Sequence, residues 1–158
     1  MTQAGVEVLR GLPLVQGLEA RHIDKLGELA AEVSFEKDQI VFREGETHDQ
    51  FYIILSGKVA LEIQAPGRIF RAQIVQEGDE FGWSSMLAGG KKHFQARALQ
   101  RVRALAFDAD QLQKACAEDT TFGYALLSRL LRVVSNRLEA TRLRLLDIYA
   151  PGTERLAT

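Results

Sequence analysis

Short apolar runs separated by turn residues fill the middle of the chain. They are rich in β-branched and aromatic residues, which favour strands, and Gly, Pro, Ser and Asp stand between them. The runs lie at residues 33–35, 39–42, 51–55, 59–63, 94–99 and 102–107. Many short strands at close spacing are typical of an antiparallel roll built from two sheets. We therefore expect a mainly β fold with its roll at about residues 32–108.

Two turns in this region carry more specific predictions. Ser56-Gly57 stands between two apolar runs, which favours a two-residue hairpin at this point. Pro66-Gly67 fits the centre of a type II turn, because proline presets the first central residue and glycine tolerates the second.

Helical patterns flank the roll on both sides. Leucines recur at helical spacing within residues 6–31, and Pro13 and Gly17 divide this entry into two or three short helices. Residues 109–149 are predicted to be helical as well. We expect one domain over residues 1–150, followed by a frayed tail at 151–158.

The last predicted helix, from about Thr121 to Tyr149, carries an apolar stripe with alternating steps of four and three. The stripe consists of Leu127, Leu131, Val134, Leu138, Thr141, Leu145 and Ile148. This spacing is typical of a coiled coil and predicts a homodimer. A helix packed only on its own domain is the alternative, and an inner face of Leu126, Leu130, Val133 and Leu143 would serve it. Because both faces are apolar, we favour a helix placed between the roll and a second copy.

Residues 77–87 (EGDEFGWSSML) predict a strand ending at Gly78, a tight turn and a short helix opening around Ser84. Gly82 allows the backbone to approach a ligand, and Ser84 or Ser85 is expected to cap the helix. Free amides at a helix start attract anions. Two lysines and a histidine follow at 91–93, so we expect the ligand to carry a phosphate group.

This segment, together with Gly45, Asp49 and Gly57, resembles the phosphate-binding cassette of the cyclic-nucleotide-binding domain family. The likeness spans nearly the whole chain and is densest at residues 41–46 and 49–59. It implies an antiparallel double-stranded β-helix, or jelly roll, with short N-terminal helices and a long C-terminal dimerisation helix. The plan is also similar to the sensor half of the catabolite activator protein.

The resemblance implies a ligand site and also shows where this chain departs from the family. The family's cassette carries a Glu that accepts the ribose hydroxyl, and this position falls on Trp83, which has no acceptor. The family's phosphate-binding Arg falls on about Lys92. Thr141 matches a residue that contacts the adenine amino group, although a small residue in the dimer seam is an equal interpretation. The predicted ligand-binding residues are Gly82, Trp83, Ser84, Ser85, Lys92, His93 and Thr141.

Composition narrows the class of protein. The 158 residues are 46% hydrophobic with a net charge of −1, which gives no overall attraction to nucleic acid or membranes. A lone Cys116 excludes an internal disulfide, predicts a buried structural thiol and favours the cytoplasm. No apolar run approaches the roughly 20 residues that span a bilayer. The chain ends soon after Tyr149, so we expect neither a helix-turn-helix domain nor direct DNA binding.

Three functional hypotheses remain. The first is a non-enzymatic regulatory module that binds cyclic AMP, another cyclic nucleotide or a related anionic metabolite and signals through its dimeric C-terminal helix. The alternative is a degenerate domain that binds no nucleotide and acts as a dimeric protein-interaction scaffold. The third is a sensor of haem or an apolar effector, with His93 as the haem ligand. His22, His48 and His93 have no metal-ligand spacing, and no catalytic triad order is present.

Overall fold

The helical entry forms three short pieces. The computed structural model describes residues 3–47, 49–87 and 91–149, so His48 and the expected tail at 151–158 lie outside the described residues. The pieces are helix α1 (Gln3–Arg10), the 3₁₀ helix η1 (Pro13–Val15) and helix α2 (Ala20–Leu29). Pro13 starts η1, and Gly17 follows it with a left-handed φ of 79°. The division at these two residues is as predicted.

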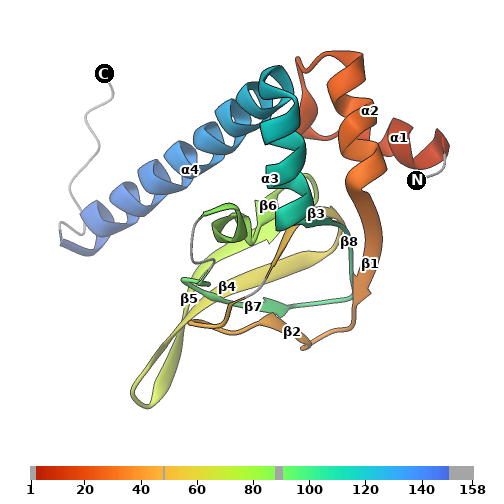
Figure 1. Cartoon of the computed structure of the whole chain (residues 1–158). Coiled ribbons are helices and arrows are strands. Elements are labelled where there is room, and N and C mark those ends of the chain that lie inside the picture. The colour runs from red at the N-terminus through yellow and green to blue at the C-terminus, as the bar shows by residue number, and fades with distance from the viewer. Residues whose placement is uncertain (1–2, 48, 88–90, 150–158) are drawn as a thin grey trace.

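Within the part of the chain that the structure describes, eight strands form two four-stranded antiparallel sheets (Figure 1). In chain order they are β1 (Ala30–Phe35), β2 (Ile40–Phe42), β3 (Gln50–Ser56), β4 (Lys58–Ala65), β5 (Arg68–Gln76), β6 (Glu80–Phe81), β7 (Gln95–Ala98) and β8 (Val102–Asp108). The sheet orders are β1-β8-β3-β6 and β2-β7-β4-β5. This arrangement confirms the predicted double-sheet roll.

A core of apolar side chains fills the space between the two sheets. Tyr52 and Phe81 are paired across β3 and β6, and their rings stack with centroids 4.8 Å apart. Ala96 and Ala98 from β7 and Ala104 from β8 are fully buried in the same cluster. Small residues at these inward positions allow the sheets to approach closely around the larger rings.

The predicted hairpin at Ser56-Gly57 is wrong. β3 ends at Ser56 and β4 begins at Lys58, but the two strands belong to different sheets. Gly57 has φ 98°, and a Cβ there would lie 2.5 Å from the carbonyl oxygen of Arg101. The glycine therefore turns the chain from one sheet into the other against the β7–β8 connection.

The turn predicted at Pro66-Gly67 is present. β4 and β5 pair from Lys58↔Gln76 to Ala65↔Arg68, which leaves Pro66 and Gly67 as the loop. Gly67 has φ 77°, as the second central residue of a type II turn requires.

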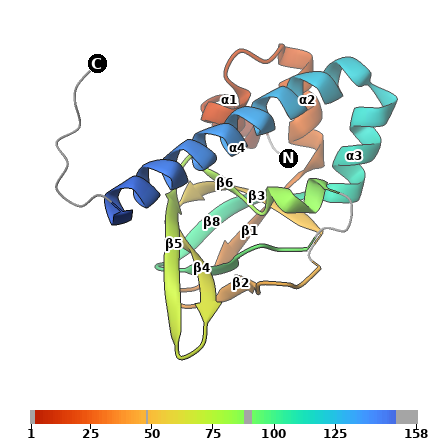
Figure 2. The ribbon, with the colours of Figure 1, turned by 90° about the vertical axis from the view of Figure 1, so that its left-hand side faces the viewer.

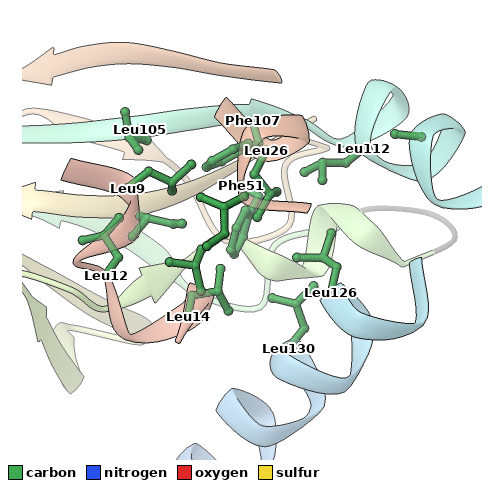
Figure 3. Close-up of a cluster of buried hydrophobic side chains, with 14 of the residues drawn as sticks. Leu9, Leu12, Leu14, Leu26, Phe51, Leu105, Phe107, Leu112, Leu126 and Leu130 are labelled. Carbon is green, nitrogen blue, oxygen red and sulfur yellow. The ribbon is translucent and has the colours of Figure 1, made fainter. Parts of the chain in front are cut away.

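The helices cover the outer face of the β1-β8-β3-β6 sheet through a second core (Figure 3). Helix α3 (Ala109–Glu118) begins after Asp108, whose carboxylate accepts a hydrogen bond from the Gln111 amide. Helix α4 (Thr120–Tyr149) contributes Leu126 and Leu130, which pack with leucines of α1, η1 and α2 and with Phe51 and Phe107. This core binds the N-terminal helices, the roll and α4 into one body.

The two faces of α4 behave differently. Leu126, Leu130 and Val133 pack inward as expected, but Leu143 is 39% exposed and does not serve that face. The predicted seam residues Leu127, Leu131, Leu138, Leu145 and Ile148 are 48–70% exposed. In Figures 1 and 2, α4 crosses one end of the roll and its C-terminal part extends beyond it, so the last turns of the helix have no domain surface to cover. Within the described residues, no helix combines the length and apolar character needed to cross a membrane.

Cys116 is less enclosed than predicted. Its thiol is free and only half-buried in α3, where it packs against the first turns of α4 near Gly123. Partial burial raises the pKa of this thiol, which disfavours the reactive thiolate.

Two glycine substitutions test the crossing between the sheets. Gly57→Ala should lower the free energy of unfolding by about 3 kcal/mol or more, because a left-handed φ and a clash with the Arg101 carbonyl act together. Gly67→Ala is the control, since its φ is also left-handed but no atom lies within 4 Å of the added Cβ. It should cost about 1–2 kcal/mol. Equal losses in urea unfolding would show that Gly57 is not sterically constrained.

Candidate ligand-binding pocket

A cavity of about 360 Å³ lies between the roll and α4. Its size is within the range of small-molecule sites in proteins, about 300–1,000 Å³. The residues that line it are Phe42, Leu61, Gln73, Gly82, Trp83, Ser84, Lys92, His93, Phe94, Val134, Arg137, Leu138 and Thr141. One wall is therefore the β-roll with the segment after β6, and the other is α4.

Six of the seven predicted ligand-binding residues line this cavity. They are Gly82, Trp83, Ser84, Lys92, His93 and Thr141. Ser85 is buried, and its hydroxyl donates a hydrogen bond to the Gly82 carbonyl at 2.9 Å. The fold thus brings together positions almost 60 residues apart in the chain, from Gly82 to Thr141. Their role in binding stays a prediction.

Gly82 has a left-handed backbone conformation at the start of the cassette turn. It has φ 79° and precedes the 3₁₀ helix η2 (Trp83–Met86) as its N-cap. A Cβ on Gly82 would lie 3.0 Å from the carbonyl oxygen of Gln50 and 3.5 Å from the Lys92 Nζ. The site therefore needs glycine for its left-handed backbone conformation and favours it for the close approach of the Gln50 carbonyl oxygen.

The expected serine cap is wrong. Gly82 occupies the N-cap position of η2, and no side chain caps this turn among the described residues. Ser84 and Ser85 lie inside the turn instead, because the chain enters it one residue earlier than predicted. η2 is only four residues long, so it offers a much weaker dipole than the expected helix.

Lys92 is a buried residue of the cavity wall. Its side chain is 2% exposed, and Nζ donates to the carbonyl oxygens of Gly82 at 2.8 Å and Gln50 at 3.4 Å. Nζ also lies 4.9 Å from the centroid of the Phe42 ring. Burial lowers the pKa of Lys92 to about 8, and the charge of Asp49 opposes this shift. Two of its three donors therefore hold the cassette in place, which leaves one for a ligand.

Arg137 is a cationic wall residue that the sequence-based site did not include. It is half-buried on α4, and within the described residues its guanidinium has no hydrogen bond and no carboxylate within 4.0 Å. Burial lowers its pKa, while the charges of Glu80 and Asp79 act in the opposite direction. The signal for Arg137 was its spacing: it stands four residues before Thr141 and so lies on the same face of the helix.

Trp83 and Thr141 each have a structural contact. Trp83 is half-buried and packs against the helical core while also lining the cavity. The hydroxyl of Thr141 donates to the Arg137 carbonyl within α4 at 2.9 Å, and the residue is otherwise exposed. An indole and a threonine at these positions can contact a flat apolar group, but Trp83 offers no acceptor to a sugar hydroxyl.

The cavity lining is mainly apolar, with two cations, Lys92 and Arg137, and a few neutral polar side chains. Aromatic and aliphatic side chains from both walls, such as Phe94 and Leu138, surround the sites of Lys92 and Arg137. Among the described residues no group of three His, Cys, Asp or Glu side chains is placed to hold a metal ion, and His93 stands alone on the wall. The arrangement suits a ligand with an anionic group and an apolar or aromatic body.

A family model described as cyclic nucleotide-binding domain matches residues 32–119. The CRP-like cAMP-activated global transcriptional regulator of Mycobacterium tuberculosis is 34% identical over 143 residues, which are 90% of this chain and 62% of that protein. The chain thus spans less than two thirds of this relative.

Two solved structures share the fold. A cyclic nucleotide-binding domain from Methylobacillus flagellatus superposes with a TM-score of 0.79 at 21% identity, covering 97% of this chain and 85% of the other. The N-terminal domain of a transcriptional regulator from Streptomyces coelicolor gives a TM-score of 0.68 at 28% identity, covering 92% and 99%.

The pH dependence of stability tests the environment of Lys92. Its pKa is about 8 in the folded chain and 10.5 in the unfolded one, so the unfolded chain binds more protons between these values. The free energy of unfolding of the wild type should therefore rise relative to Lys92→Met from pH 8 to pH 10.5, by at most about 3 kcal/mol. Urea unfolding at each pH measures this difference, and Lys58→Met, an exposed lysine of β4, corrects for loss of a charge. Parallel curves for wild type and Lys92→Met would contradict the buried ammonium.

Proposed function

Because this chain belongs to the cyclic nucleotide-binding domain family, we propose that it is a regulatory module that binds a small anionic ligand between its roll and α4. Cyclic AMP or another cyclic nucleotide is the first candidate. The observation that carries this proposal is the cavity itself, which has the cassette around Gly82 on one wall and Arg137 on the other.

The anionic group of the ligand is assigned to the two cations. Arg137 is favoured as the main contact because its planar guanidinium can bind a phosphate with two parallel hydrogen bonds, and all its donors are available. Lys92 contributes charge and its one remaining N–H donor. Ser84 lines the same cavity. The Ser85 hydroxyl stabilises the turn by donating a hydrogen bond to the Gly82 carbonyl.

The sugar side of the site is weaker than in relatives that carry Glu at this position. A charge-assisted hydrogen bond contributes on the order of 1.5–3 kcal/mol, so its loss at Trp83 should reduce affinity roughly ten- to a hundredfold. We therefore expect binding in the micromolar range, with the indole facing the apolar part of the ligand.

Signalling is assigned to α4, which forms part of the pocket and carries the exposed apolar stripe. Contacts of a ligand with Arg137 and Thr141 would favour one packing of α4 on the roll over another. The stripe from Leu127 to Ile148 would join two copies, so a shift of α4 in one protomer reaches the other. We place this module in the cytoplasm, in keeping with its free thiol, and assign it no catalytic role.

A second candidate function is a dimeric scaffold that binds no nucleotide. Two observations favour it: Trp83 replaces the sugar acceptor, and Lys92 already donates to two backbone carbonyls. The cavity of about 360 Å³ and the unengaged guanidinium of Arg137 support the ligand-binding function more strongly.

Titration with cyclic AMP distinguishes these functions. Trp83 is the single tryptophan of the chain and lines the cavity, so its fluorescence should change as a ligand enters. Arg137→Gln should weaken binding roughly ten- to a hundredfold through the lost charge-assisted contacts. Arg144→Gln, an exposed arginine of the same helix, is the control and should bind as the wild type does.

Calorimetry on the same samples, with cyclic GMP alongside, excludes optical artefacts. Absence of binding by either method up to millimolar nucleotide would refute a cyclic-nucleotide ligand and favour the scaffold. Binding that is unchanged in Arg137→Gln would refute the assigned role of Arg137.

The dimer has its own test. Leu131→Glu places a charge in the proposed seam, where the leucine is 69% exposed, and should convert the dimer to a monomer without loss of helix content. Leu146→Glu is the matched control, since Leu146 is 61% exposed on α4 but lies outside the stripe. Sedimentation equilibrium should show a dimer for wild type and Leu146→Glu only. A monomeric wild type would contradict the assignment.

A further inference from the structure

A second cleft of about 300 Å³ lies among η1, the turn between β5 and β6, and α4. It shares Gln73 and Arg137 with the candidate ligand-binding pocket, so the two spaces are neighbours along α4. We name it the arginine cleft after Arg129, Arg132 and Arg137, which recur on one face of the helix.

The three guanidiniums of this cleft lack close partners. Among the described residues none of them makes a hydrogen bond, and none has a carboxylate within 4.0 Å. Arg142, further along the same helix, instead donates to Glu139 at 3.0 Å. In the part of the chain that the structure describes, none of the three guanidiniums is therefore neutralised by an ion pair of its own.

The acidic residues of the cleft, Asp79 and Glu80, balance this charge only in part. Three guanidiniums face two carboxylates. The Asp79 carboxylate accepts the Gln76 amide at 2.9 Å and so shapes the β5–β6 turn. Glu80 is 6% exposed, and burial raises the pKa of its carboxyl group, against the effect of Arg137. A net positive cleft remains.

Residues of the N-terminal segment pack around the side chain of Arg129. A Cβ on Gly17 would lie 2.7 Å from a terminal nitrogen of the Arg129 guanidinium. Only a residue without a side chain at position 17 therefore leaves room for this guanidinium. Pro13 and Leu14 form an apolar wall beside it. Such a wall displaces water and strengthens the attraction between an anion and the guanidiniums. Asn136 adds an amide that can donate as well.

We propose that the arginine cleft binds the phosphate group of a small soluble metabolite, at a site separate from the candidate ligand-binding pocket. Guanidiniums suit this group because their fork matches two phosphate oxygens. Since Arg137 borders both spaces, an anion in the cleft competes with a ligand in the pocket for this residue. The cleft also joins the N-terminal segment to α4, so its occupant fixes the helix on the roll.

Inorganic phosphate is the probe for this site. In a titration of the ¹⁵N-labelled full chain at constant ionic strength, saturable shifts are expected for the amides of Gly17 and Gly78 and the side-chain amide of Asn136. Arg132→Gln should weaken the apparent affinity about tenfold. Arg132 is exposed and lines only this cleft of the two, so the folded state and the pocket should be unaffected. Arg144→Gln is the control and should leave the titration unchanged.

Three results would overturn the proposal. They are the absence of saturable shifts up to tens of millimolar phosphate, shifts that persist unchanged in Arg132→Gln, and shifts confined to Trp83 and Lys92. The first would show that the acids and arginines only neutralise one another across the cleft. Failure here leaves the cyclic-nucleotide titration at Trp83 untouched, because Arg132 does not line that pocket.

Discussion

The packing of the inner face of α4 on the rest of the molecule is the constraint on which the candidate pocket depends. Leu126 and Leu130 enter a core that already contains the N-terminal leucines and Phe51 of the roll. Each such leucine contributes about 2–5 kcal/mol relative to alanine, which is large against the stability of a domain this size. Because these contacts fix the first half of α4, Arg137 and Thr141 are placed opposite the roll, where they line the cavity.

Buried charge sets the character of that cavity. Lys92 and Arg137 both lose part of their hydration, and burial lowers both pKa values. Lys92 is compensated by the backbone of Gly82 and Gln50, so its charge mainly stabilises the cassette. Arg137 has no hydrogen-bond partner among the described residues and is compensated only by the charges of Glu80 and Asp79, so it would gain most from an anionic ligand. The wall formed by α4 thus holds the cation that has the fewer partners.

Much of the fold could be predicted from local patterns. Turn residues and short apolar runs located the roll, Pro13 and Gly17 divided the entry, and Pro66-Gly67 formed the expected turn. The error at Gly57 has a simple cause: a tight glycine turn between two strands looks the same whether they pair or diverge into different sheets. That choice depends on the distant β7–β8 connection at Arg101. Leu143 was misplaced because α4 extends past the roll, so its last turns have no domain surface to cover.

The sequence predicted which residues lie near one another in the site. It did not predict what each side chain contacts there. The cassette motif and Thr141 indicated the right wall residues, yet the sequence did not show that Lys92 turns its ammonium toward Gly82 or that Ser85 faces the turn. The sequence-based site did not include Arg137, which is one of five arginines along α4. Only the crossing of α4 over the roll places it beside Gln73 and Gly82.

A crystal structure of the full chain grown with cyclic AMP tests the central claim most directly. The account predicts a nucleotide in the cavity with its phosphate oxygens in hydrogen-bond contact with the Arg137 guanidinium, while Lys92 keeps its bond to the Gly82 carbonyl. A nucleotide whose phosphate contacts Lys92 alone, or an empty cavity closed by the Trp83 indole, would contradict it.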